Sequence, residues 1–312
     1  MALFLFALAA ILFFILISGG YVFFAGCYRR KENPWFDAEA LKATPYGEFS
    51  EHIVAAKQWL DANGAQQVSI LNRDGLNLRG LWVPAQNPKG TMLLVHGYRS
   101  CILVDFGLVL DYYHKLGMNL LLPDQRSHGK SEGRFITFGV KESGDILEWL
   151  YFHNHTFGNY PVILSGLSMG ASTVLYLADK QLPDNVKGII ADCGFTSPKA
   201  IISSVFTGVT HLPAVPTIWI TDLFARVFAH FSLSEMDTRV TLAGNRLPII
   251  MVHGTEDTFV PCEMTKKGFA ACTGPKQLLL VEGAGHGVSY LHDKDRYTNL
   301  VEAFLKRYIE GI

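Results

Sequence analysis

One short stretch decides the fold, Ile163-Leu164-Ser165-Gly166-Leu167-Ser168-Met169-Gly170-Ala171. An apolar run is followed by Ser168, which has a glycine two residues away on either side. In a Gly-x-Ser-x-Gly pattern the serine lies at a sharp turn from a strand into a helix, where these two positions face neighbouring backbone. Glycine relieves the crowding, and the strained turn lifts the hydroxyl above the sheet edge. The stretch therefore predicts Ser168 to be a nucleophile.

Eight strand candidates surround this turn, each a short apolar or alternating run bounded by turn residues. They cover residues 68–73, 76–83, 92–95, 118–122, 162–164, 186–191, 248–252 and 277–281. Helical patterns fall between the later ones, around residues 104–116, 139–153, 168–180, 262–272 and 294–309. Two antiparallel strands followed by alternating strands and helices predict an α/β protein with a mostly parallel eight-stranded sheet covered on both faces.

Ser168 has candidate partners further along the chain. A serine hydroxyl is a poor nucleophile at neutral pH, so it needs a base that is itself oriented by an acid. The segment HGTEDTFVP at residues 253–261 follows one candidate strand, and GAGHG at residues 283–287 follows the next. The order along the chain is therefore Ser, Asp, His.

These motifs resemble those of the α/β-hydrolase superfamily from about residue 68 to the end of the chain. HGTEDTFVP is similar to the superfamily's H-G-x-x-D-x-x-V-P acid loop, which implies that Asp257 is the acid. VEGAGHG is similar to its histidine loop, which implies that His286 is the base. The chain most resembles bacterial membrane-anchored Bem46-like esterases and lipases, and this implies an α/β-hydrolase fold with a catalytic triad.

Each partner has a competitor nearby. Glu256 adjoins Asp257, but it occupies a position without a fixed identity in the acid-loop pattern. His292 lies near His286, but no glycines precede it. His253 belongs to the same motif as the acid, and we interpret it as structural.

Acyl transfer also needs two N–H donors for the oxyanion. The resemblance implies the backbone N–H groups of Met169, directly after the nucleophile, and of Tyr98, in the loop LVHGY. The segment DQRSHGKSEG at residues 124–133 is similar to a D-x-R-G-x-G-x-S-x-G turn of the superfamily, with Ser127 in place of the first glycine. We interpret this turn as structural, with His128 stabilising it.

Composition excludes several other functions. The 312 residues carry a formal net charge of −1 without a long basic block, so no nucleic-acid binding is expected. The cysteines are scattered and form no C-x-x-C pair, so neither a disulfide framework nor a zinc knuckle is indicated. They are Cys27, Cys101, Cys193, Cys262 and Cys272. The resemblance implies no metal or organic cofactor, and a serine at the elbow argues against haloalkane dehalogenase and epoxide hydrolase chemistry.

The first 28 residues contain no charged side chain. Residues 2–24 supply the roughly 20 apolar residues that a membrane span needs, whereas a cleaved signal peptide has a basic start and a shorter apolar core. We predict an uncleaved transmembrane anchor over residues 1–28. An alternative interpretation is a lipoprotein site at Phe24-Ala25-Gly26-Cys27, with Cys27 lipidated.

Arg29, Arg30 and Lys31 follow the anchor directly. Because flanking Lys and Arg stay on the cytoplasmic side, they favour a cell-membrane protein with a cytoplasmic catalytic domain. The extracellular side stays open as an alternative, because hydrolases of this kind also act outside the cell.

The rest of the chain divides into two parts. Residues 29–64 are expected to form a juxtamembrane connector and a short helix that begins near Ser50. Residues 65–312 are expected to form the α/β-hydrolase domain, with a mostly apolar insertion at about residues 195–246. By resemblance, this insertion forms a cap over the active site.

These features predict a serine hydrolase that cleaves carboxylic esters of a hydrophobic or acyl-chain substrate through Ser168, Asp257 and His286. An apolar cap on a membrane-tethered enzyme fits a small ester or a lipid better than a sugar or a charged peptide. The alternatives are a peptidase or amidase, a thioesterase or acyltransferase, and a catalytically silent membrane-tethered binding module. The sequence does not determine the oligomeric state.

Overall fold

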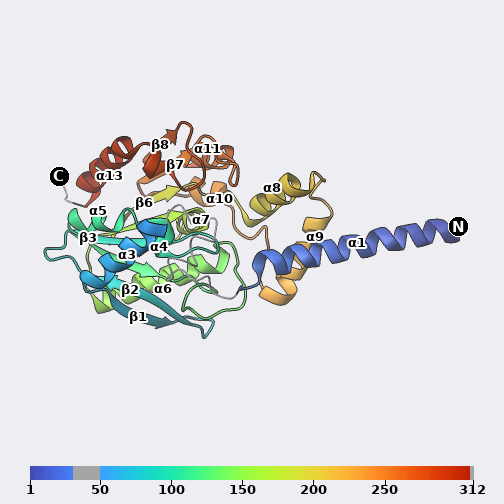
Figure 1. Cartoon of the computed structure of the whole chain (residues 1–312), viewed down its shortest axis with the longest axis horizontal. Helices are drawn as coiled ribbons and strands as arrows, with labels where there is room; N and C mark the ends of the chain where they lie inside the picture. Colours follow the sequence, from blue (N-terminus) through green and yellow to red (C-terminus); the bar gives the residue numbers. More distant parts are fainter. Residues whose placement is uncertain (31–49, 310–312) are drawn as a thin grey trace.

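A mostly parallel sheet of eight strands forms the centre of the computed structural model, which describes residues 1–30 and 50–309 (Figure 1). The strand order across the sheet is β1-β2-β4-β3-β5-β6-β7-β8. β1 pairs antiparallel with β2, and β2 pairs antiparallel with β4, while every later pairing is parallel. The strands are β1(Gln66–Leu71), β2(Asn77–Val83), β3(Gly90–Val95), β4(Met118–Pro123), β5(Val162–Leu167), β6(Val186–Asp192), β7(Ile249–Gly254) and β8(Lys276–Val281).

Each predicted strand is present, with ends that shift by at most a few residues. β3, β4 and β7 are buried along their whole length, as expected for parallel strands covered on both faces. The sequence prediction of an eight-stranded sheet, with an antiparallel start and a parallel remainder, is confirmed.

Helices cover both faces of the sheet (Figure 1). One apolar core lies between the sheet and α3(Ser50–Ala62), α4(Ile102–Phe106), α5(Leu110–Lys115) and α13(Lys294–Tyr308). The opposite core involves α6(Val140–Thr156), α7(Met169–Leu175), α10(Thr238–Ala243) and the end of α11(Cys262–Ala271). The short helix α12(Ser289–His292) contacts α13 and β7.

The single helix expected around residues 104–116 is wrong, because the structure has two, α4 and α5. Gly107 separates them. A Cβ at this position would clash with the carbonyl oxygen of Leu103 and lie 2.9 Å from the Cβ of Ala56 on α3. Glycine therefore allows α4 to end against α3, and this break shapes the wall of the cavity described below.

The N-terminal helix α1(Ala2–Cys27) is apolar and long enough to cross a membrane, which makes it a candidate span. Most of its surface is exposed, but Gly19, Gly20, Phe23 and Cys27 are buried against the rest of the molecule. The predicted connector falls largely on residues 31–49, which lie outside the described part of the chain, as does Lys31.

The end of α1 is fixed to the domain by polar contacts. The Arg29 guanidinium donates to the carbonyl oxygens of Gly129 and Ser131, both at 2.6 Å. Tyr28 forms an antiparallel bridge with Phe135. The backbone that leaves α1 therefore joins the turn after β4.

Residues 195–246 form α8(Pro198–Thr210), α9(Thr217–Phe224), the π-helix η2(Ala225–Ala229) and α10. Ser197 caps α8, accepting the Ala200 N–H at 3.2 Å, and Pro198 occupies the first turn. α8 and α9 project from the sheet on the side where α1 enters, and α9 packs across α1 (Figure 1). A third apolar cluster joins α1, these helices and Met169.

We predict that Gly19→Ala destabilises the protein, because the added Cβ would lie 2.5 Å from the Cβ of Ile220 on α9. Overpacking of this kind costs about 1–3 kcal/mol. Gly26→Ala is the matched control, since its Cβ would meet only Phe138, at 3.9 Å. Thermal unfolding of the full chain in detergent micelles should give a lower Tm for Gly19→Ala alone. Equal Tm values for the two variants would contradict the packing of α1 on α9.

Candidate active site

Ser168 lies between β5 and α7 with a left-handed φ of 56°. Its N–H donates to the carbonyl oxygen of Asp192 at 2.8 Å, which ties the turn to β6. A Cβ at Gly170 would clash with the carbonyl oxygen of Val95, and one at Gly166 would clash with the backbone of Gly170. Both glycines of the motif are therefore required by the close approach of neighbouring backbone.

Ser168, His286 and Asp257 lie in one hydrogen-bonded row. The Nε2 atom of His286 is 2.9 Å from the Oγ of Ser168, and its Nδ1 atom is 2.6 Å from the Oδ2 of Asp257. Ser168 and Asp257 are buried, while the side chain of His286 is 26% exposed. The imidazole therefore has one edge accessible, with its orientation fixed by the acid.

The carboxylate of Asp257 is surrounded by donors. Its Oδ1 accepts the N–H groups of Phe259 and Val260 at 2.9 and 2.8 Å. Burial works to raise the pKa of Asp257, but hydrogen bonds from His253 and His286 outweigh it, so the pKa lies well below its ordinary value. Asp257 therefore stays ionised at any working pH.

His253 contacts Asp257 directly, which the sequence interpretation of a merely structural residue did not foresee. Its Nε2 lies 3.2 Å from the Oδ2 of Asp257 and 2.9 Å from the carbonyl oxygen of Val260. Both neighbours only accept hydrogen bonds, so Nε2 carries the proton. His253 is thus a second donor to Asp257.

The loop after β3 lies against the serine. A Cβ at Gly97 would lie 3.3 Å from the Cβ of Ser168. The Gly97 N–H donates to Asp105 Oδ2 at 2.5 Å, and the Ser100 hydroxyl donates to Asp105 Oδ1 at 2.6 Å. Asp105 therefore holds the backbone that leads into Tyr98, and burial raises the pKa of its carboxyl.

The side chain of Tyr98 points away from the serine, toward α1. Its ring stacks on Phe138 with centroids 5.2 Å apart, and its hydroxyl donates to the carbonyl oxygen of Gly26 at 2.7 Å. The Arg99 guanidinium donates to the carbonyl oxygen of Ala25 at 2.6 Å. The loop that contains the Tyr98 N–H is therefore bonded to the end of the candidate membrane helix.

His128 does not bond to Ser168 but holds the loop that contains Tyr98 and Arg99. Its Nε2 accepts the Arg99 N–H at 3.0 Å, and its Nδ1–H donates to the carbonyl oxygen of Arg126 at 2.9 Å. Burial and the neighbouring His96 lower the pKa of His128 to about 3. Ser127 adopts a left-handed φ of 63°, so it takes a conformation for which glycine is usual.

A cavity of about 490 Å³ opens beside Ser168 and His286. Its apolar wall comes from α4 and the residues that follow, from α3, and from α12 and the segment before it. The apolar side chains that line the cavity include Ile53, Leu103, Val104, Phe106, Leu108, Val109, Val288 and Leu291 from this wall, together with Leu167 and Phe259. Residues 195–246 contribute none of the described lining residues, so this wall is not formed by the expected cap.

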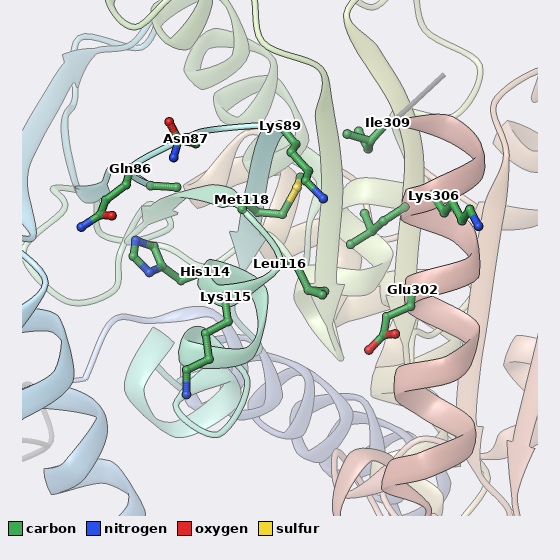
Figure 2. A pocket seen from close by; sticks show the side chains of 13 residues that line it. Gln86, Asn87, Lys89, His114, Lys115, Leu116, Met118, Glu302, Lys306 and Ile309 are labelled. Atoms are coloured by element: carbon green, nitrogen blue, oxygen red, sulfur yellow. The ribbon is translucent and has the colours of Figure 1, made fainter. Parts of the chain in front are cut away.

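A second cavity of about 630 Å³ lies at the amino ends of β3 and β4 (Figure 2). Lys89, Met118 and Glu302 are among its lining residues. Ser168 follows the carboxyl end of the parallel strand β5, so the second cavity lies at the end of the sheet away from Ser168. It contains none of the expected site residues.

Three groups able to bind a metal gather near the serine. The ligand atoms of Cys193, Asp257 and His286 lie within 4.8 Å of one another. Burial raises the pKa of the Cys193 thiol well above its ordinary value, which disfavours the thiolate that a metal requires. The Nδ1 of His286 is also engaged with Asp257. The donor set therefore fits a hydrogen-bonded acid–base pair better than a metal site.

The structure brings together Ser168, His286 and Asp257, with the Tyr98 loop and Met169 alongside. Glu256 is exposed and His292 belongs to α12, and neither is part of the hydrogen-bonded row of Ser168, His286 and Asp257. The sequence reasoning missed Asp105. A carboxylate within the apolar run ILVDFGLVL was the available signal, because a charge in such a run is rarely left unpaired.

Comparisons with known proteins agree with this architecture. The family model described as serine aminopeptidase, S33, matches residues 86–239. An uncharacterized protein of Bacillus subtilis is 27% identical over 235 residues, which is 74% of this chain and 76% of that protein. An uncharacterized membrane protein of Saccharomyces cerevisiae is 21% identical over 243 residues, 77% of this chain and 79% of its own length.

Among solved structures, an esterase of Pyrococcus furiosus is similar with a TM-score of 0.66 and 21% identity. The match covers 80% of this chain and 92% of that one. The predicted fold class is confirmed by these matches together with the strand order. The closer resemblance to Bem46-like enzymes stays a prediction.

We predict that stability falls with pH below about 6.5, in part because His128 is buried and neutral. Its pKa is lowered from 6.5 to about 3 on folding, so its contribution is complete above 6.5 and is lost as the pH drops toward 3. His128→Asn removes the titrating group and should reduce the slope of unfolding free energy against pH by about 1.4 kcal/mol per pH unit below about pH 5.5, and by little above pH 6.5. Urea unfolding of the full chain between pH 7.5 and 4.5 measures both slopes. Identical slopes would contradict the prediction, whatever the variant's stability at pH 7.5.

Proposed function

This chain is a hydrolase of the α/β-hydrolase superfamily, and we propose that it cleaves carboxylic esters with Ser168 as nucleophile, His286 as base and Asp257 as acid. One observation carries the proposal. A hydrogen-bonded Ser168–His286–Asp257 row lies at the side of an apolar cavity, with one edge of the imidazole accessible. That arrangement is the one that activates a serine for acyl transfer.

In the proposed reaction, His286 Nε2 takes the hydroxyl proton as Ser168 Oγ attacks the ester carbonyl carbon. The imidazolium is stabilised by Asp257, which stays ionised. Collapse of the tetrahedral intermediate breaks the bond to the alcohol, and His286 returns the proton to the leaving oxygen. Water then attacks the acyl-enzyme by the same steps and releases the acid.

The oxyanion would be held by the backbone N–H groups of Tyr98 and Met169. Met169 is the first residue of α7. N–H groups in the first turn of a helix have no acceptor within the helix, and the helix dipole favours negative charge there. Asp105 supports the Tyr98 side by holding the preceding Gly97 N–H. These bonds exist before substrate binds, so the donors need little reorganisation during the reaction.

The cavity favours an acyl chain or another apolar group as the substrate's acid part. Its wall between α3 and α4 is largely aliphatic. Two acids also line it, but the oxygens of Asp105 are bonded to Gly97 and Ser100, and Asp192 is buried and accepts the Ser289 hydroxyl at 3.2 Å. Neither offers a free carboxylate to a substrate amine.

A peptidase that takes free N-termini is therefore the weaker proposal, although the matching family model carries that description. The acids of residues 195–246 are engaged elsewhere. Asp222 pairs with Arg226, Asp237 pairs with Arg239, and Glu235 accepts the Ser232 N–H. A thioesterase or acyltransferase would use the same acyl-enzyme with another donor or acceptor.

We also propose that α1 anchors the enzyme in the cell membrane. Its apolar, mostly exposed surface supports this assignment. The positive charges of Arg29, Arg30 and Lys31 favour a cytoplasmic catalytic domain.

Ser168→Ala is expected to lower kcat/KM for p-nitrophenyl butyrate by about 10⁴-fold or more, and Asp257→Asn by about 10⁴-fold. Glu256→Gln is the matched control, because it changes the adjacent acid and should retain activity within a few-fold. Initial rates are measured with the full chain in detergent, beside aminoacyl p-nitroanilides. Turnover of the anilides alone would replace the ester proposal with a peptidase.

Fluorophosphonate labelling tests the nucleophile independently of substrate. Wild type should be labelled, and Ser168→Ala should not. A folded wild type that is neither labelled nor active would support the silent binding module.

Acyl-length preference should depend on the wall formed after α4. Leu108 lines the cavity and is half-buried, so Leu108→Trp should shorten the space for the acyl chain. We expect kcat/KM for p-nitrophenyl octanoate to fall about tenfold, while butyrate changes less than twofold. The control is Val240→Trp on the exposed side of α10. An unchanged octanoate-to-butyrate ratio in Leu108→Trp would place the acyl chain elsewhere.

A further inference from the structure

The helix pair α8–α9 contains a long stretch without charge. From residue 200 to residue 221 there is no Asp, Glu, Lys or Arg, and His211 is the only titratable side chain. Lys199 and Asp222 bound the stretch on either side. A surface segment of this length in a soluble domain normally carries several charges, because such segments face water.

This stretch, the end of α9 and the adjoining η2 also expose large apolar side chains. They are Val205, Val209, Leu212, Val215, Trp219, Leu223, Val227 and Phe228. They belong to consecutive elements that project from the domain (Figure 1). An exposed apolar surface of this kind marks an interaction site.

The same elements pack directly on α1. The hydroxyl of Thr221 lies 3.2 Å from the carbonyl oxygen of Gly19, and Phe23 has ring contacts with Phe224 and Phe228, both at 6.1 Å between centroids. Gly19 and Gly20 provide the close approach, as small residues do between helices in membranes.

The order of these contacts gives the direction of α9. Ile220 meets Gly19, Phe224 meets Gly20 and Phe23, and Phe228 meets Phe23 and Phe24. α9 and η2 therefore cross α1 obliquely and run in the same sense as α1, toward the domain. Its amino end and the preceding turn point toward the N-terminus of α1, which is the part that would lie in the bilayer.

We propose that residues 200–221 insert into the same lipid bilayer as α1, forming a second membrane contact. α1 is apolar all round and mostly exposed, and Gly19, Gly20 and Phe23 are buried where α9 packs on it, so the exposed face of α9 continues the surface that lipid would contact. If residues 2–21 cross the roughly 30 Å hydrocarbon core, Gly19 lies near its domain-side boundary. Trp219 then lies at the interface, where tryptophan is favoured.

Insertion at two points would fix the direction in which the active-site cavity faces. Arg30, just after α1, lines that cavity, so its mouth lies beside the place where α1 leaves the bilayer. On the basis of the proposed function, the enzyme would draw its ester from the membrane rather than from water. This last step depends on esterase activity, whereas insertion does not.

Trp219 serves as the probe of insertion, because 62% of its surface is exposed. The full chain is reconstituted in phosphatidylcholine vesicles with acyl chains brominated at shallow or deep positions. The emission of Trp219 is obtained as the difference between the wild type and Trp219→Phe. The bromines should quench this emission, and the shallow ones more strongly than the deep ones. Trp149→Phe is the matched control, since Trp149 is 1% exposed. The emission of Trp149, obtained as the difference between the wild type and this variant, should not be quenched by either lipid.

Absence of quenching for Trp219 overturns the proposal. Unquenched emission together with chemical cross-linking of two chains through this face would identify a second copy of the chain as the occupant instead.

Leu212→Glu tests delivery from the membrane, because it places a charge at the turn between α8 and α9. Hydrolysis of monooleoylglycerol held in vesicles should fall about tenfold, while p-nitrophenyl butyrate in solution should change less than twofold. Val240→Glu introduces the same charge on exposed α10 and should affect neither. Equal losses on both esters would contradict delivery from the membrane. A wild type inactive on both would end the ester proposal, and Trp219 quenching would still decide insertion.

Discussion

The close approach of backbone around Ser168 is the constraint on which the rest of the structure depends. The end of β3, the end of β5 and the start of α7 meet there, and the contacts at Gly166 and Gly170 leave no room for a Cβ. Gly170 passes the carbonyl of Val95, and Gly97 lies against the serine itself. The left-handed φ of Ser168 costs on the order of 1–3 kcal/mol and persists because these contacts leave the turn no other path.

Buried polar groups fix the loop that faces this turn. Asp105 accepts a hydrogen bond from the Gly97 N–H, and His128 accepts one from the Arg99 N–H. The Gln125 side chain donates to the carbonyl oxygen of His96 at 2.5 Å. In a low-dielectric environment such bonds are strong, and an unpaired group would be costly. The network therefore holds backbone donors in place before any substrate binds. It does so by burying two titratable groups, Asp105 and His128, whose pKa values are shifted by burial.

Local patterns predicted the strands and the residues that follow them, because turn chemistry and apolar runs lie within a few positions of sequence. Contacts between distant segments had no such signal. The hydroxyl of Tyr98 reaches Gly26 across 72 positions, and the Arg99 guanidinium reaches Ala25 across 74. Likewise, nothing in residues 195–246 indicated that they would pack along α1 and leave the cavity wall to α3 and α4.

The docking of α1 means that the candidate membrane helix and the loop beside the serine form one continuous structure. Arg99 donates to carbonyl oxygens at the end of α1, where the helix leaves them without partners, and its charge suits the negative end of the helix dipole. Its neighbour Tyr98 carries the N–H that we propose as an oxyanion donor. A displacement of α1 relative to the sheet would strain these bonds and be transmitted to that N–H within two residues. The helix is therefore a structural element of the site as well as an apolar surface, because its last carbonyl groups accept the hydrogen bonds that hold the side chains of Tyr98 and Arg99.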